Sequence, residues 1–185
     1  APIMIAAIPR LSEFIGGAVR PDSPWWAQGL PGLYGIIHAF RGGDSRSTLR
    51  KSLSVLDQGA PLCIFPEAGS WAQMIRPARP GMAFIASSSG APVHPVSITG
   101  AVDLFTMWRP TVRIVFHPAM TPPPDTLKGK ARRVALDAFG EQVMAQIAAG
   151  LPDHQKGKFS NDPAIRAEAE IAAIYPFEQE HMRGM

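Results

Sequence analysis

The stretch LRKSLSVLDQGAPLCIFPEAGS, residues 49–70, carries a helix, a strand and a turn in immediate succession. Leucines recur at helical spacing along residues 49–56, and Gly59 stands where a helix C-cap is expected. The apolar run 61–65 then predicts a short strand. We expect this strand, with Phe65 at its end, in the interior of the sheet. Pro66 ends it, because proline cannot donate to a central sheet ladder. A helix that leads directly into a strand is typical of an α/β sheet.

The same alternation continues on both sides of this stretch. Further strands are expected over residues 13–19, 35–40, 93–98 and 112–116, and further helices over residues 1–8, 81–88 and 164–174. A long helix is expected after Asp125, which would cap it, and Gly150 would close it. The sequence therefore predicts one α/β domain with a mixed, mostly parallel sheet flanked by helices.

The composition is that of a folded chain with its own core. Of 185 residues, 46% are hydrophobic and 18% are charged, which is too apolar for a disordered chain. The 19 Pro and 17 Gly have no fixed period and lie between apolar runs, where they indicate turns. A single Cys excludes an internal disulfide and a cysteine-based zinc site.

The charge pattern favours an anionic partner. The formal net charge is +3, and the positive excess lies toward the front of the chain, which suits a phosphate, a coenzyme or a lipid headgroup. No arginine-rich run, zinc-finger spacing or aromatic-basic RNA motif indicates nucleic acid. A general polyanion binder stays open as an alternative, and so does a nucleotide-binding α/β protein, although the spacing of Gly29, Gly32 and Gly35 differs from the dinucleotide fingerprint.

Two strand ends carry candidate binding residues, because ligands of open α/β sheets collect at the carboxyl ends of strands. Arg41 follows the predicted strand 35–40 and precedes two glycines, so its guanidinium could approach a phosphate closely. The alternative is a surface arginine in an ordinary turn. Glu67 follows the strand 61–65, where it could accept hydrogen bonds from substrate or brace backbone amides, or could serve as a turn residue.

Other reactive side chains are expected to be structural. Cys63 lies inside an apolar strand and is interpreted as a buried thiol. His38, His94 and His117 lie within or at the ends of strands without metal-ligand spacing.

Contact with a membrane is expected to be peripheral at most. The longest apolar stretches fall short of a membrane span. The aromatic pair Trp25 and Trp26 would serve as interfacial anchors or as packing in a Pro-rich loop.

In order and spacing, these blocks resemble the glycerophospholipid acyltransferase family, of which 1-acyl-glycerol-3-phosphate acyltransferase is the type. Gly35-Ile-Ile-His-Ala-Phe-Arg41 is similar to the family's second block, an arginine after a short apolar strand. Phe65-Pro-Glu-Ala-Gly-Ser-Trp71 is similar to its F-P-E-G-T-R-S block, and Ala91-Pro-Val-His-Pro-Val-Ser-Ile98 to its fourth. The Gly-led helix between them resembles residues 79–85. The resemblance covers residues 1–152, and residues 153–185 are interpreted as a tail with a short helix.

The sequence departs from the family pattern at two places. The family's H-x-x-x-x-D block is absent, since the spacing from His38 to Asp44 is one residue too long. The helix that follows this block resembles residues 1–9, so we expect the block upstream of Ala1. Ser70 stands at the position of the family's arginine, for which Arg76 or Arg79 would substitute.

The resemblance implies transfer of a fatty acyl group from an acyl thioester, on coenzyme A or carrier protein, to a lysolipid hydroxyl in phospholipid biosynthesis. It implies that Arg41 holds acceptor phosphate. It also implies a substrate-binding turn and a basic wall, formed by Glu67, Ala68, Gly69, Ser70, Arg76 and Arg79. The absent His–Asp pair would supply the general base, so no catalytic residue is assigned within this chain, and no metal or redox cofactor is expected. The site would lie at the cytoplasmic face of a membrane. The alternative is a non-catalytic module that binds lipid phosphate.

Overall fold

Three short parallel strands form the first sheet. The computed structural model describes residues 4, 7–8, 12–17, 36–39, 45–67, 73–101, 103 and 108–174 of the chain. Strand β1 (Glu13–Gly17) lies between β2 (Ile36–Ala39) and β3 (Leu62–Ile64), and both pairings are parallel. Phe14, at the middle of the sheet, is 2% exposed. The predicted α/β architecture is confirmed.

Helix α4 (Ser45–Asp57) connects β2 to β3, as the leucine spacing predicts. The chain leaves this helix through Gly59, whose φ of 73° lies in the left-handed region that glycine adopts without strain. Ser52, on the buried side of α4, donates to the Thr48 carbonyl at 2.8 Å, which satisfies its hydroxyl inside the core.

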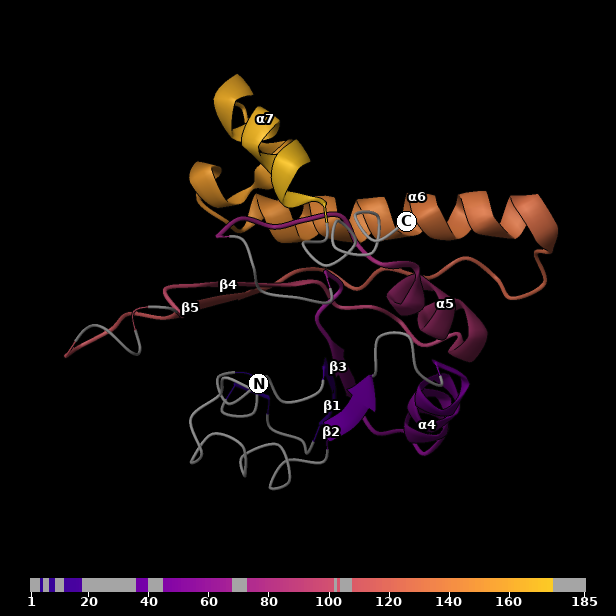
Figure 1. Cartoon of the computed structure of the whole chain (residues 1–185). Coiled ribbons are helices and arrows are strands. Elements are labelled where there is room, and N and C mark those ends of the chain that lie inside the picture. The colour runs from indigo at the N-terminus through magenta and orange to yellow at the C-terminus, as the bar shows by residue number, and fades with distance from the viewer. Residues whose placement is uncertain are drawn as a thin grey trace, which may run out of the picture.

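The main hydrophobic core lies between two helices that follow the parallel sheet. Helix α5 (Pro80–Ser89) begins with Pro80 in its first turn and ends at Gly90 in the left-handed conformation. Helix α6 (Gly129–Ala149) packs against it, and Figure 1 shows α5 beneath α6. The buried side chains that meet there are Met82, Ala83, Ala86, Leu136, Phe139 and Val143.

The second sheet is an antiparallel pair, β4 (Val96–Thr99) and β5 (Arg113–Phe116). In the described part of the chain this pair is separate from the parallel sheet, so the parallel and antiparallel strands of the predicted mixed sheet belong to two small sheets. An isolated bridge between Val93 and Met120 extends the pairing at its base. The pair reaches out from the helices in Figure 1.

Two expected details are wrong. Asp125 does not cap α6, since Lys128 occupies the N-cap position, and Asp125 instead forms an ion pair with Arg132. The strand before Glu67 was expected inside its sheet, but β3 is an edge strand among the described residues, and Phe65 just after it is 50% exposed. The cause is pairing order: the earlier strand β1 takes the central place.

The C-terminal part consists of two 3-10 turns, η2 (Asp153–Gln155) and η3 (Gly157–Phe159), followed by helix α7 (Pro163–Ala172). The Asp162 carboxylate caps α7 by accepting from the Ala164 amide at 2.8 Å. This helix confirms the short helix expected over residues 164–174. Among the described residues, none of the helices is both long and apolar enough to cross a membrane.

Candidate substrate-binding turn

Two predicted site positions follow strands of the parallel sheet in the sequence. Because β2 and β3 both run parallel to β1, their carboxyl ends lie at the same edge. The chain reaches Glu67 three residues after β3 ends at Ile64, and position 41 follows two residues after β2 ends at Ala39. Arg41 itself lies outside the described residues, as do Ala68, Gly69 and Ser70.

Glu67 ties its turn to a segment nine residues further along the chain. One of its carboxylate oxygens, Oε2, accepts a hydrogen bond from the Arg76 backbone amide at 2.9 Å. Beside it, the Pro66 carbonyl accepts from the Arg79 backbone amide at 2.8 Å. These two bonds fix residues 76–79 against the turn, so Glu67 braces backbone amides, which is one of the two functions expected for it.

Arg76 is a partner of Glu67 rather than an open cation. Its side chain is only 4% exposed, and Nε lies 3.6 Å from Glu67 Oε2, whose side chain is 25% exposed. A guanidinium with so little access to solvent is directed toward protein groups. Arg79, by contrast, is exposed. Of the two arginines expected to complete a basic wall, Arg79 is therefore the one that solutes can reach in this conformation.

The electrostatics of Glu67 reflect this half-enclosed position. Burial raises the pKa of its carboxyl above the ordinary value, while the hydrogen bond from the Arg76 amide and the charge of the Arg76 guanidinium lower it, and burial has the larger effect. A carboxyl under such opposed influences is found more often at functional sites than elsewhere. The turn therefore combines a fixed backbone with a carboxyl group of raised pKa.

The C-terminal tail supports this segment from the other side. The Ile75 amide donates to the Gln155 carbonyl at 2.9 Å, and Gly157, with φ of 55°, lies so close to the Ile75 carbonyl that a Cβ would collide with it. A small cavity of about 130 Å³ opens here, lined by Arg76, Pro77, Ala78, Arg79, Pro80 and Ala173. Sequence reasoning missed this support, and the only available signal for it was the glycine at 157.

The remaining candidates take structural positions. Burial raises the pKa of the Cys63 thiol, a direction expected for an inert thiol on a strand. His117 contacts the Ser97 hydroxyl with its Nε2 at 2.8 Å. His94 is exposed, and neither the His38 side chain nor the pair Trp25 and Trp26 belongs to the described parts of the structure.

The part of the chain that contains this turn is similar to known proteins. A protein-family model described as Acyltransferase matches residues 13–99, which run from β1 to the end of β4. None of the curated proteins matches the chain. One similar solved structure is the 1-acyl-sn-glycerophosphate (LPA) acyltransferase PlsC from Thermotoga maritima, at 20% identity and a TM-score of 0.44. The match covers 72% of this chain and 56% of that one, so the chain spans little more than half its length.

Proposed function

Because residues 13–99 match the family model described as Acyltransferase, we propose that the protein transfers a fatty acyl group from an acyl thioester to the hydroxyl of a lysophospholipid or similar lysolipid. The donor carries its acyl group on coenzyme A or on a carrier protein, and the product enters phospholipid biosynthesis. The observation that supports this most directly is the Phe65-Pro66-Glu67 turn, braced by Arg76 at the carboxyl edge of the parallel sheet.

In this proposal the residues that follow β2 and β3 have different roles in binding the acceptor. Arg41 holds the phosphate of the acceptor through charge-assisted hydrogen bonds. The turn from Glu67 through Ala68 and Gly69 to Ser70 shapes the acceptor site. Arg79, which is exposed, adds positive charge to its wall. Arg76 acts through Glu67 as a positioning residue, since its own side chain is almost fully enclosed. No metal or redox group has a role in the proposed reaction.

The acyl transfer also needs a general base. An uncharged hydroxyl attacks a thioester poorly, and a positioned base supplies roughly 10²- to 10⁴-fold in rate. No histidine of the printed sequence has an aspartate five positions later. We therefore expect no turnover from these 185 residues alone, and we propose that an H-x-x-x-x-D pair outside them supplies the base.

The test is release of thiol from acyl-coenzyme A in the presence of lysophosphatidic acid in detergent. The printed chain is compared with a natural chain that contains it together with an H-x-x-x-x-D pair. We expect turnover from the second chain only, and replacement of its motif histidine by alanine should abolish it. Turnover by the printed chain would place the base elsewhere, and an inactive longer chain with the pair intact would overturn the proposed reaction.

A second function is favoured by one observation, the absence of the His–Asp spacing from the sequence. In that case the domain binds lipid phosphate without chemistry. Equilibrium binding of lysophosphatidic acid to the printed chain, with binding weakened by Arg41→Ala and no turnover in any longer chain, would support this reading. In both proposals the protein acts peripherally at the cytoplasmic face of a membrane, where lysolipids reside.

A further inference from the structure

The β4–β5 hairpin is fixed firmly to the body at its base. Ser97 on β4 is 1% exposed, and its hydroxyl donates to the Ile147 carbonyl in the last turn of α6 at 2.6 Å. At Gly100 the two arms of the hairpin approach so closely that a Cβ would collide with the Thr111 carbonyl, and the φ of Gly100 is +75°. The base is therefore fastened to the body at Ser97 and closely packed at Gly100.

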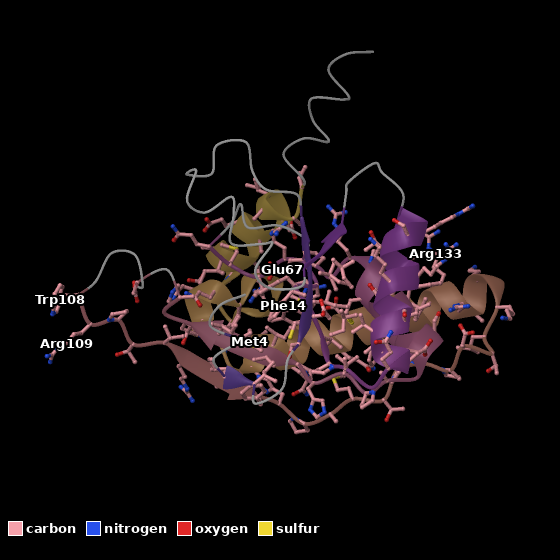
Figure 2. The ribbon with its side chains drawn as sticks, turned by 90° about the horizontal axis from the view of Figure 1, so that it is seen from below. Met4, Phe14, Glu67, Trp108, Arg109 and Arg133 are labelled. Carbon is pink, nitrogen blue, oxygen red and sulfur yellow. The ribbon has the colours of Figure 1, made fainter. Side chains whose placement is uncertain are left out.

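The far end of this hairpin presents an aromatic side chain to solvent. Trp108 is 95% exposed, more than any other large hydrophobic residue among the described residues. Figure 2 shows Trp108 and Arg109 together at the end of the hairpin, remote from the labelled residues Met4, Phe14 and Glu67. A tryptophan at this exposure contributes no core packing, and the indole ring prefers an environment that is apolar at one end and wet at the other.

The residue next to Trp108 carries a positive charge. Arg109 is exposed, and so is Arg113 further along the same arm, where it pairs with Thr99 of β4. Asp103 is the one acidic residue of the sequence between Thr99 and Arg113. An aromatic ring beside an arginine is complementary to an anionic lipid surface, because the ring enters the headgroup layer while the guanidinium group meets a lipid phosphate.

We propose that the outer end of the second arm of the β4–β5 hairpin, Trp108 with Arg109 (here the tip), docks onto an anionic phospholipid bilayer. This inference rests on the proposed function, whose substrates reside in bilayers, and it names the surface from which the enzyme works. A protein partner fits the tip less well. A stable protein interface takes roughly 800 Å² from each side, whereas a single tryptophan offers about 150–250 Å².

The first experiment measures partition onto vesicles that contain neither lysolipid nor acyl-coenzyme A. Full-length protein is floated with phosphatidylcholine vesicles that include phosphatidylglycerol. Trp108→Ala should lower the partition coefficient about fiftyfold, as expected for loss of roughly half a tryptophan surface from the interface. The matched control is Ile171→Ala on α7, where the side chain is 73% exposed, and its partition should equal that of the parent. Circular dichroism verifies that both variants are folded.

A second pair of variants isolates the charge. Arg109→Gln should reduce partition about fivefold on vesicles with phosphatidylglycerol and leave it unchanged on pure phosphatidylcholine, since one arginine near an anionic surface contributes about 1 kcal/mol. Arg133→Gln, which removes an exposed charge from α6, should have no effect on either vesicle. Added salt should weaken binding of the parent more than binding of Arg109→Gln.

Several outcomes would overturn the inference. They are a parent that stays in the soluble fraction, a Trp108→Ala variant that partitions like the parent, or an Ile171→Ala variant that loses as much. A dimer that dissociates on Trp108→Ala would assign the tip to a second copy of the chain instead. Binding to vesicles and turnover are measured separately. A protein that binds vesicles through Trp108 but has no turnover contradicts only the proposed reaction. A protein that has turnover but does not bind vesicles contradicts only the docking.

Discussion

Replacement of Ser97 by alanine tests whether one hydroxyl fastens the hairpin to helix α6. The Ser97 hydroxyl has a single hydrogen, which it donates to the Ile147 carbonyl at 2.6 Å. Its oxygen therefore accepts from Nε2 of His117, which lies 2.8 Å away. Ser97→Ala removes both bonds and adds no volume, so no repacking obscures their loss.

The expected cost follows from these two bonds. Each neutral hydrogen bond contributes about 1 kcal/mol net. The Ile147 carbonyl keeps a second donor, the Gly150 amide at 3.2 Å, and the half-buried His117 ring can reach water, so neither partner bears a full desolvation penalty. We expect Ser97→Ala to lower the free energy of unfolding by about 2 kcal/mol.

Urea unfolding followed by circular dichroism measures this loss, provided that the slope with denaturant stays that of the parent. The matched control is Ser54→Ala on the exposed side of α4, where the hydroxyl meets only the exposed Gln58 amide at 3.2 Å. That variant should stay within about 0.5 kcal/mol of the parent. A Ser97→Ala variant as stable as Ser54→Ala would refute the assignment of Ser97 as the fastening.

Three further predictions concern the turn and its surroundings. Burial raises the Glu67 pKa above 4.5, so the folded state holds this proton more tightly than the unfolded chain. The free energy of unfolding should therefore fall as the pH rises from 4.5 through the folded pKa, and Glu67→Gln should flatten that part of a pH series of urea titrations. Gly157→Ala should cost about 2–4 kcal/mol in the same assay through collision with Ile75, whereas Gly129→Ala, at the same positive φ in open space, should cost only about 1 kcal/mol. Arg41→Ala in an active chain should lower kcat/KM for a phosphate-bearing acceptor by about tenfold or more, and unchanged kinetics would remove Arg41 from the site.

Most elements of the fold could be predicted because their signals are local. The leucine spacing of α4, the glycines at 59 and 90 and the proline after β3 each act within a few residues. The order of strands in the sheet has no such local signal. No local pattern distinguishes β1 as the central strand, because the order depends on how the strands pack across the whole sheet. For the same reason the sequence could not predict that the antiparallel pair forms its own sheet.

At the site, too, only the local features could be predicted. The residues beside Glu67 predict its position in a turn after a strand. They do not predict the burial of Arg76, because it depends on a tail that returns to the turn more than 70 residues later. Gln155 and Gly157 fix residue 75 through backbone contacts, which carry little sequence signature apart from the glycine. The error at Asp125 arose because a good capping residue stood near the helix, while its carboxylate was already engaged by Arg132.

The central place of β1 has a consequence for how the chain acquires its structure. Phe14 pairs with Ile36 on one side and with Cys63 on the other, so β1 lacks its partner on the second edge until β3 has been made. Pairings between distant segments form slowly, and unpaired strand edges attract other chains in the meantime. During synthesis, one edge of β1 therefore stays unpaired until β3 is made. In a chain that ended between β2 and β3, one edge of β1 would stay unpaired and could pair with strands of other chains.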